Sequence, residues 1–318
     1  MRKLAHFSLL LAALSVRVDQ IQAAVPLGME DGTITADQIS ASSCYQFPDC
    51  ADHARLNHPA EGGRRGAWCA ADDDPSPWIQ VDLLTNFLIT GVITQGRYPH
   101  YSQWVTSYQV LYRPDGEAEF QMVTDASGQN VTFKGNTDKN TPVENDLPIY
   151  VVARYVRLLP VTFNEHVSMR FELLGENVTE CYEQADASDY RGSVSETEEG
   201  ITCQVWTVQK PHSHNRKPSH YPDAGLGAHN LCRNPDGENT AWCYTIDPDV
   251  RWALCSVGEP SETCPVVTTT RPEGTTTGMK PEDNPATTPK RTTTGMEPED
   301  DPTITIPSGT SEYHCYYQ

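Results

Sequence analysis

The chain has 318 residues, ten cysteines and a formal net charge of -20 at pH 7. Its length suggests about two domains. The surplus of acidic residues argues against a nucleic-acid partner, because binding to phosphates requires a basic patch. The ten cysteines argue against a cytosolic protein, since thiols are kept reduced in the cytosol and are rarely clustered there.

The N-terminus has the pattern of a secretory signal. Arg2 and Lys3 precede the apolar run FSLLLAALSV, and a small-residue exit ends at Ala23. The apolar run is too short to span a bilayer, and no other segment is long and apolar enough to do so. We therefore expect residues 1–23 to be a signal peptide and the mature chain to be secreted.

From Pro26 to about Gly175 the chain has the pattern of short strands separated by turns. The segments WIQVDL, FLITGVITQG, YQVLYR, FQMVT and ARYVRLLPV alternate apolar and polar residues, or are apolar and β-branched. Turn sequences such as RPDG and ASGQN separate them, and no convincing helical period is present. This pattern predicts an all-β antiparallel sandwich or barrel.

One loop in this region places two aromatic residues between two cysteines. The segment SSCYQFPDC puts Tyr45 and Phe47 between Cys44 and Cys50. A disulfide between these cysteines would close a tight loop and hold both rings outward, where rigid aromatic rings lose little entropy on binding. The alternative, that the rings pack back onto the rim of the domain, remains equally open.

A second loop, GRYPHYSQW, carries Arg97, Tyr98, His100 and Tyr101. Aromatic faces beside a guanidinium suit a sugar ring, a lipid interface or a peptide. Elsewhere, the acidic run from Asp72 to Asp74 offers oxygen ligands for calcium. Acidic loops are more often simply solvated, so we expect no metal site there, and nothing in the chain implies a cofactor.

The blocks of this region resemble a known family in their order. PLGMEDGTITADQISASS, ARLN, GAWCA, WIQVDL, TQGRY, QWVTSYQVLY, FKGN, ARYVRLLP and MRFELLG together resemble the discoidin family, also called the coagulation factor 5/8 type C domain. We place this domain at residues 24–178. The resemblance implies a jelly-roll-like β-sandwich whose loops at one end contact sugars, anionic phospholipid, collagen or other proteins.

The sequence departs from the family pattern at three places, and each departure leads to an expectation. Most members join the two domain ends by a disulfide, but no cysteine stands at Ala24 or Val25. Collagen-receptor members carry an acid just before GAW, whereas this chain has Arg65 nearby, which argues against collagen as the ligand. Cys69 lacks the partner near the domain end that those receptors have, so we expect it to be a buried, inert thiol.

From Cys181 to Cys264 the composition changes, because six cysteines occur among few aliphatic residues. Such a thin core requires covalent cross-links. The cysteines lack the short paired spacings of zinc sites. Sequence alone leaves many cysteine pairings open.

The blocks YRG, CQVW, CRNPDG and WCYTIDPDVRW, at these cysteine spacings, are similar to a kringle from end to end. We place the kringle at residues 180–264. The resemblance implies disulfides Cys181–Cys264, Cys203–Cys243 and Cys232–Cys255. It also implies that His212 and His214, in PHSH, belong to a structural loop.

The kringle resemblance also implies a candidate lysine site. Lysine-binding kringles hold the ligand's methylenes in an aromatic trough, with acids for the ammonium at one end and basic residues for a carboxylate at the other. Carried over by motif, the acids are Asp236 and Glu238, the trough is Trp242, Tyr244 and Trp252, and the basic end is Arg251, with Arg216 as a candidate second. Glu238 and Ala241 depart from the strongest pattern, and many kringles keep the rings without binding lysine.

After Pro265 the chain is rich in Thr and Pro, and TTTGMKPEDNP is nearly repeated as TTTGMEPEDDP. Such a segment cannot bury enough apolar surface to fold, so we expect residues 265–318 to be disordered. Thr with Pro favours an O-glycosylated stalk over a plain linker. The Asn-X-Thr triplets at Asn130 and Asn177 are expected N-glycosylation acceptors.

The sequence contains no GxSxG, HExxH or glycine-rich phosphate loop. We therefore expect a secreted, non-catalytic recognition or adhesion protein. Its discoidin loops would bind a cell-surface or matrix ligand (a glycan, a phospholipid headgroup or a protein), and its kringle would bind a lysine-bearing protein. The lone Cys315 keeps open the alternative of a fragment or regulatory front end of a larger serine protease or receptor. A matrix protein with the tail as its stalk is a further alternative.

Overall fold

The computed structural model describes residues 25–46, 50–58 and 66–264. The expected signal peptide, Phe47, Arg65 and the Thr- and Pro-rich tail lie outside these ranges. Within the described residues, no helix is long and apolar enough to cross a membrane.

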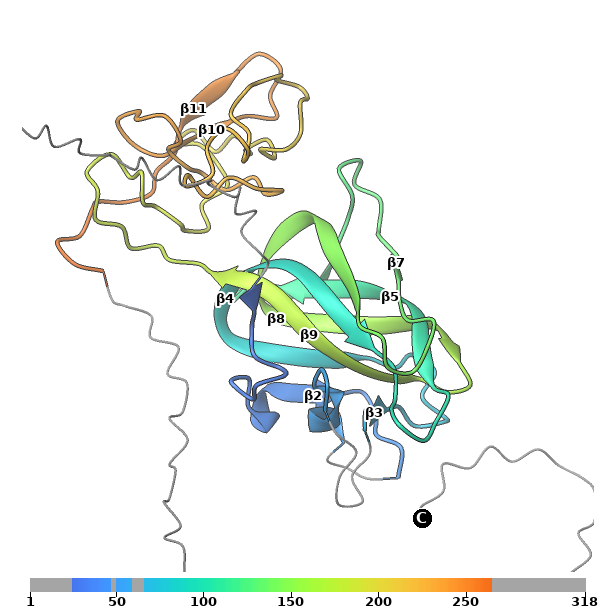
Figure 1. Ribbon diagram of the computed structural model, residues 1–318. Coiled ribbons are helices and arrows are strands. Elements are labelled where there is room, and N and C mark those ends of the chain that lie inside the picture. The colour runs from blue at the N-terminus through green and yellow to red at the C-terminus, as the bar shows by residue number, and fades with distance from the viewer. Residues whose placement is uncertain (1–24, 47–49, 59–65, 265–318) are drawn as a thin grey trace, which may run out of the picture. The chain divides into compact units, whose positions relative to one another are not determined.

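The first part of the described chain is a curled β-sheet with almost no helix (Figure 1). The strands are β1 (Val25–Pro26), β2 (Ile39–Ala41), β3 (Trp68–Cys69), β4 (Ile79–Gln95), β5 (Trp104–Arg113), β6 (Gln121–Met122), β7 (Phe133–Lys134), β8 (Val143–Asn164) and β9 (Ser168–Asn177), and the 3-10 turns are η1 (Ala36–Gln38) and η2 (Ala51–Ala54). The hydrogen-bonded order is β1-β9-β4-β8-β5-β6, while β2 pairs with β4, β3 with β9 and β7 with β5. The pairings between these strands are antiparallel. The all-β fold predicted from the sequence is confirmed.

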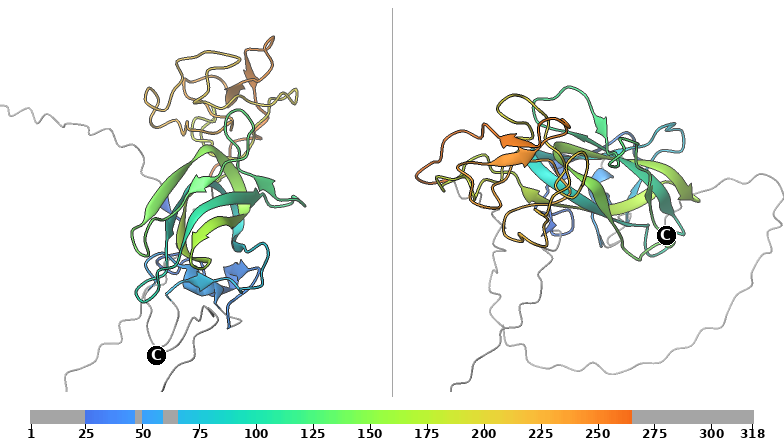
Figure 2. Two further views of the ribbon diagram at one scale, coloured as in Figure 1. Left: turned by 90° about the vertical axis from the view of Figure 1, so that its right-hand side faces the viewer. Right: turned by 90° about the horizontal axis from the view of Figure 1, so that it is seen from above.

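The segments WIQVDL and FLITGVITQG form one long strand, β4. Its pairing with β8 shifts register between Asp82 and Phe87, where Leu84 has a positive φ of 68°. The backbone N–H of Leu84 donates to Oδ1 of Asp82 at 2.8 Å, which stabilises this turn-like conformation. Irregularities of this kind bend a strand, and the long strands are strongly twisted in every view (Figures 1 and 2).

Buried apolar residues of the long strands and of β3 fill the interior of the sheet. The largest fully buried side chains of this part include Trp68, Tyr108, Phe171, Met169 and Ile79. Burying a large apolar side chain stabilises a fold by roughly 1.5–3 kcal/mol. This core gives the domain stability without a disulfide between its ends.

Hydrogen bonds close the two ends of this domain instead of a disulfide. Strand β1 pairs with β9, with Val25 opposite Gly175. Just beyond β1, the backbone N–H groups of Gly28, Met29 and Glu30 donate to the buried carboxylate of Glu172 on β9. The N-terminal segment is thus fastened to the last strand at several points.

The part from Cys181 to Cys264 consists mostly of loops, with one antiparallel pair, β10 (Trp242–Tyr244) and β11 (Trp252–Leu254). Disulfides join Cys181 to Cys264, Cys203 to Cys243 and Cys232 to Cys255, the pairs that the kringle resemblance implies. Each native bridge in a small secreted domain typically contributes about 2–5 kcal/mol.

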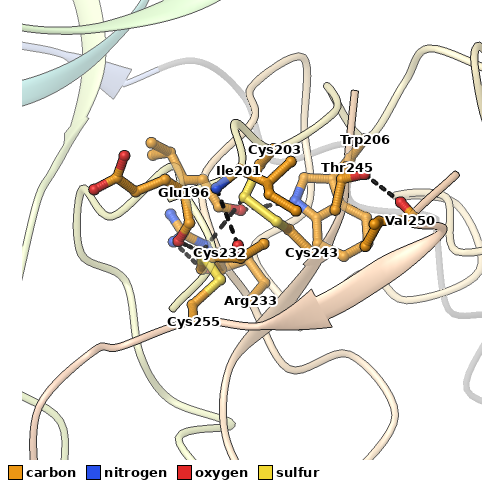
Figure 3. The surroundings of a disulfide bond; sticks show 12 residues. Glu196, Ile201, Cys203, Trp206, Cys232, Arg233, Cys243, Thr245, Val250 and Cys255 are labelled. Atoms are coloured by element: carbon orange, nitrogen blue, oxygen red, sulfur yellow. Dashed lines mark hydrogen bonds between the residues drawn. A yellow bond between two sulfur atoms is a disulfide. The ribbon is translucent and has the colours of Figure 1, made fainter. Parts of the chain in front are cut away.

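Two of these disulfides lie side by side at the centre of this part of the chain (Figure 3). The Sγ atoms of Cys203 and Cys232 are 3.7 Å apart. Trp206 is buried in the same cluster and its Nε1–H donates to the carbonyl of Leu231 at 2.8 Å. Among the described residues, only these four sulfur atoms have a spacing that suits a metal ion, and all four are consumed by disulfides.

Candidate ligand-binding surfaces

Strands β10 and β11 bring the three expected trough residues together, and we call these rings the aromatic cluster (Trp242, Tyr244 and Trp252). Tyr244 stands opposite Trp252 in the β10–β11 register. The ring centroids of Trp242 and Tyr244 are 5.0 Å apart, and those of Trp242 and Trp252 are 5.8 Å apart. Trp252 is 45% exposed, whereas Trp242 and Tyr244 are 4% and 6% exposed. Trp252 therefore offers most of the accessible aromatic surface.

Asp236 lies beside the aromatic cluster, as the resemblance implies. The indole Nε1–H of Trp242 donates to Oδ1 of Asp236 at 3.1 Å. The Nε and Nη2 groups of Arg216 both donate to Oδ2, at 3.0 and 2.6 Å. Both carboxylate oxygens therefore have partners, and this bonding raises the pKa of Arg216 above its usual value.

The turn that carries the acids is shaped by Asn234. Its Oδ1 accepts the backbone N–H groups of Gly237 and Glu238, and Gly237 has a φ of 80°, which favours glycine. The Glu238 side chain points from this turn into solvent and makes no hydrogen bond or ion pair with the described residues. The second expected acid is therefore an exposed carboxylate.

Of the two residues expected at the basic end, only Arg251 lies beside the aromatic cluster. Its guanidinium carbon lies 5.3 Å from the centroid of the Tyr244 ring, and its Nη2 donates to the carbonyl of Ser213 at 2.6 Å. Arg216, expected as a second basic residue at this end, instead pairs with Asp236. The motif places Arg216 in this loop but does not reveal that its side chain reaches Asp236.

His214 is a neighbour of the aromatic cluster that the sequence analysis did not place there. Its ring stacks on Tyr244 with centroids 4.3 Å apart and an interplanar angle of 12°. Burial and the nearby Arg251 lower the pKa of His214, which favours the neutral ring. The PHSH segment indicated that His214 lies in a loop. It could not indicate the contact with Tyr244, because that contact depends on how the loop packs against β10.

In the first part of the chain, a disulfide between Cys44 and Cys50 closes the first aromatic loop. Tyr45 is half-buried, and its ring meets the ring of His166 edge-on at 5.5 Å. The Tyr45 ring therefore packs against the domain, which is one of the two alternatives that the sequence left open. Phe47 lies outside the described residues.

The second loop exposes some of its expected residues and buries another. Tyr98 is 46% exposed and His100 is exposed, whereas Arg97 is only 5% exposed. The Arg97 guanidinium carbon lies 3.7 Å from the centroid of the Tyr101 ring, and its Nη1 donates to Oε1 of Gln103 at 2.8 Å. Arg97 is therefore a buried residue that contacts Tyr101 and Gln103 within the loop, and its role as a ligand contact stays a prediction.

Lys139 adds a cation to this loop that the sequence analysis missed. Its Nζ donates to the carbonyl of Pro99 at 2.7 Å and lies 5.9 Å from the centroid of the Tyr98 ring. We call Tyr98, His100, Tyr101 and Lys139 the tip. Lys139 is far from the tip in sequence, so no local motif could have indicated the contact.

A chain of polar groups runs from the exposed Asp72 through His166 to the buried Ser168 and Gln103. His166 Nε2 lies 3.1 Å from Oδ1 of Asp72, and its Nδ1 lies 3.2 Å from Oγ of Ser168. Ser168 Oγ in turn donates to Oε1 of Gln103 at 3.2 Å. The order Asp, His, Ser resembles a hydrolase triad, but Ser168 is 0% exposed, so no substrate could reach its hydroxyl. These contacts therefore connect the loop around Asp72 with the second aromatic loop at Gln103.

Two acids of the run from Asp72 to Asp74 make contacts with neighbouring side chains, and Cys69 lies in the interior. Asp72 contacts His166, and Oδ2 of Asp74 accepts the hydroxyls of Ser42 and Ser43 at 2.5 and 2.6 Å. Cys69 is fully buried. The expected glycosylation sites, Asn130 and Asn177, are both exposed, and their modification stays a prediction.

Comparison with known proteins bears on both parts. A family model described as "F5/8 type C domain" matches residues 38–173, and one described as "Kringle domain" matches residues 181–260. Human retinoschisin is 37% identical over 161 residues, which cover 49% of this chain and 70% of that protein.

Two further matches concern the first part of the chain. The human "EGF-like repeat and discoidin I-like domain-containing protein 3" is 37% identical over 167 residues, covering 50% of this chain and 34% of that protein. The solved structure of discoidin II from Dictyostelium discoideum is 24% identical, covers 45% of this chain and 56% of that chain, and gives a TM-score of 0.39.

Proposed function

Because this chain belongs to the discoidin, or F5/8 type C, family and carries a kringle after that domain, we propose that it is a secreted, non-catalytic recognition protein with two binding surfaces. The discoidin domain would span residues 24–178 and the kringle residues 180–264. The discoidin tip would bind a cell-surface or matrix ligand, and the kringle would bind proteins that present a lysine side chain. Two weak sites on one chain gain avidity when both are engaged.

The observation that carries the kringle proposal is the placement of Asp236. Trp242 Nε1 holds its carboxylate beside the aromatic cluster, and the 45% exposed ring of Trp252 lies next to Trp242. A lysine ammonium could approach the carboxylate while its methylenes lie along the Trp252 ring. The ammonium would gain a charge-assisted hydrogen bond and cation–π attraction.

The discoidin proposal is supported by the chemistry of the tip. An exposed Tyr98, an exposed His100 and the ammonium of Lys139 stand together on a loop held from beneath by Arg97. Rings beside a cation suit a glycan, an anionic phospholipid headgroup or an acidic surface of a protein. The rigid support keeps the entropy cost of binding low.

Retention on immobilised lysine tests the kringle proposal. We expect the full chain to be retained and to be released by 6-aminohexanoic acid, and Asp236→Asn to abolish retention. Asp249→Asn is the matched control, because Asp249 is exposed and lies outside the lysine site. Equal retention of the wild-type and Asp236→Asn chains would remove the assignment.

A further inference from the structure

We infer that Arg216 is a built-in competitor for the ammonium group at Asp236, so that the lysine site is occupied by the protein's own side chain before a ligand arrives. This inference rests on the proposed lysine site. It assigns Arg216 a role opposite to that of a second basic residue at the carboxylate end. Competition by Arg216 would lower the affinity for every amine ligand.

The hydrogen bonds of Asp236 carry the inference. Oδ2 accepts two N–H groups of Arg216, and Oδ1 accepts the indole N–H of Trp242. The Asp236 side chain is only 18% exposed, so a cation has little further carboxylate surface to approach. An ammonium that binds Asp236 must therefore displace the guanidinium.

Contacts within its own loop hold Arg216 in this position. Its Nη1 donates to Oδ1 of Asn215 at 2.7 Å, and its guanidinium carbon lies 5.9 Å from the centroid of the Tyr221 ring. Arginine stays charged at every physiological pH, so the pairing does not depend on protonation. The competitor is present under all conditions in which a lysine ligand would bind.

The strength of the competition follows from the exposure of the pair. The Arg216 side chain is 32% exposed, so water and salt weaken its attraction to Asp236. Pairs of this kind contribute little, which corresponds to a penalty of about two- to fivefold in ligand affinity. Arg216 thus lowers lysine affinity without blocking the site.

The two possible roles of Arg216 predict opposite effects for a ligand that lacks a carboxylate. A competitor weakens the binding of pentylamine, so removing Arg216 should strengthen it. A residue of the carboxylate end has no group to bind on pentylamine, so removing it should leave the affinity unchanged. Pentylamine therefore separates the two roles better than 6-aminohexanoic acid does.

The test is a titration of the full chain with pentylamine, followed by tryptophan fluorescence, for wild type, Arg216→Gln and Lys217→Gln. Lys217 is the next residue and is exposed, so its substitution removes the same charge without breaking the contact. We expect Arg216→Gln to bind pentylamine about two- to fivefold more tightly than wild type. Lys217→Gln should bind like wild type, and adding Asp236→Asn to Arg216→Gln should remove the gain.

The inference is overturned if Arg216→Gln binds pentylamine no more tightly than wild type does. It is also overturned if neither wild type nor Arg216→Gln binds pentylamine. Retention of the wild-type chain on immobilised lysine then shows whether the lysine site itself survives. If wild type is retained on lysine but Arg216→Gln gains no affinity for pentylamine, the lysine site stands and only the competition by Arg216 is overturned.

Discussion

Met29 and Glu172 are 143 positions apart in sequence, yet the backbone N–H of Met29 donates to Oε1 of Glu172 at 3.0 Å. Gly28 and Leu173 donate to the same oxygen, and Glu30 donates to Oε2 at 2.9 Å. Glu172 is 0% exposed, and burial raises the pKa of its carboxyl group. One side chain thus satisfies four backbone donors and fastens the first residues of the domain to its last strand.

Replacing Glu172 with Ala should lower the free energy of unfolding of the discoidin domain by about 3 kcal/mol or more, because buried N–H groups would lose their acceptor. Urea unfolding followed by circular dichroism measures this. Glu176→Ala is the control, since Glu176 is exposed on the same strand. Similar losses in the two variants would show that the N-terminal segment does not depend on this carboxylate.

Arg170→Lys should lower the stability of the discoidin domain, because Arg170 joins the loops that lie beneath the tip. Arg170 is 2% exposed, and its guanidinium donates to the carbonyl of Gly96 at 2.8 Å and to Oδ1 of Asn140 at 3.1 Å. A lysine ammonium cannot span acceptors on separate loops as the planar fork does. We expect a loss of about 2 kcal/mol in urea unfolding.

The control for Arg170→Lys is Arg154→Lys. Arg154 is partly exposed, and its guanidinium donates to Asp82 through Nε and Nη2 and to Asp115 through Nη1, contacts that the surrounding water weakens. Such a substitution should cost less than about 1 kcal/mol. If the two variants lose the same stability, the guanidinium of Arg170 is not what joins the loops.

The strands and the disulfides could be predicted from the sequence, because both depend on regular residue spacing. Contacts between side chains that are distant in sequence could not. The alternating strands predicted an all-β fold, and the cysteine spacing matched a kringle whose bridges the structure contains. The break between two expected strands is a bulge within β4, because the sequence around Leu84 resembles a turn but the ladder resumes at Phe87.

The candidate sites show the same division. The motif located Asp236 and Trp242, because both lie near cysteines of fixed spacing. It could not show that Arg216, 20 residues earlier, reaches Asp236. The charge of Arg97 suggested exposure, but Gln103 and Tyr101 provide the contacts that allow its burial. Contacts between loops are set by the fold and leave no local pattern.

Tyr98→Ala should weaken binding of the full chain to any ligand that the discoidin domain recognises. Tyr98 is the exposed ring of the tip, so its loss removes contact area without creating a cavity. Glycan and phospholipid arrays measure the binding. Leu84→Ala is the control, because Leu84 is 58% exposed and lies far along β4 from the tip. Array signals that Tyr98→Ala leaves intact would place the contact elsewhere.

Acid should destabilise the kringle through His229. Its Nε2–H donates to the carbonyl of Gly225 at 2.9 Å, and its Nδ1 accepts the backbone N–H of Leu231 at 3.1 Å. Complete burial and the nearby Arg233 lower the pKa of His229 to about 3. The unfolded chain takes up a proton near pH 6.5, whereas the folded chain does not.

The free energy of unfolding should therefore be highest above pH 6.5 and fall as the pH drops below that value, by up to about 1.4 kcal/mol per pH unit. Thermal unfolding between pH 7.5 and pH 5, followed by tryptophan fluorescence, measures the slope. His229→Gln should be less stable at pH 7.5 but should show a smaller slope, with a remainder from His214 and His166, whose pKa values are also lowered by burial. A slope that His229→Gln leaves unchanged would assign the acid sensitivity to other groups.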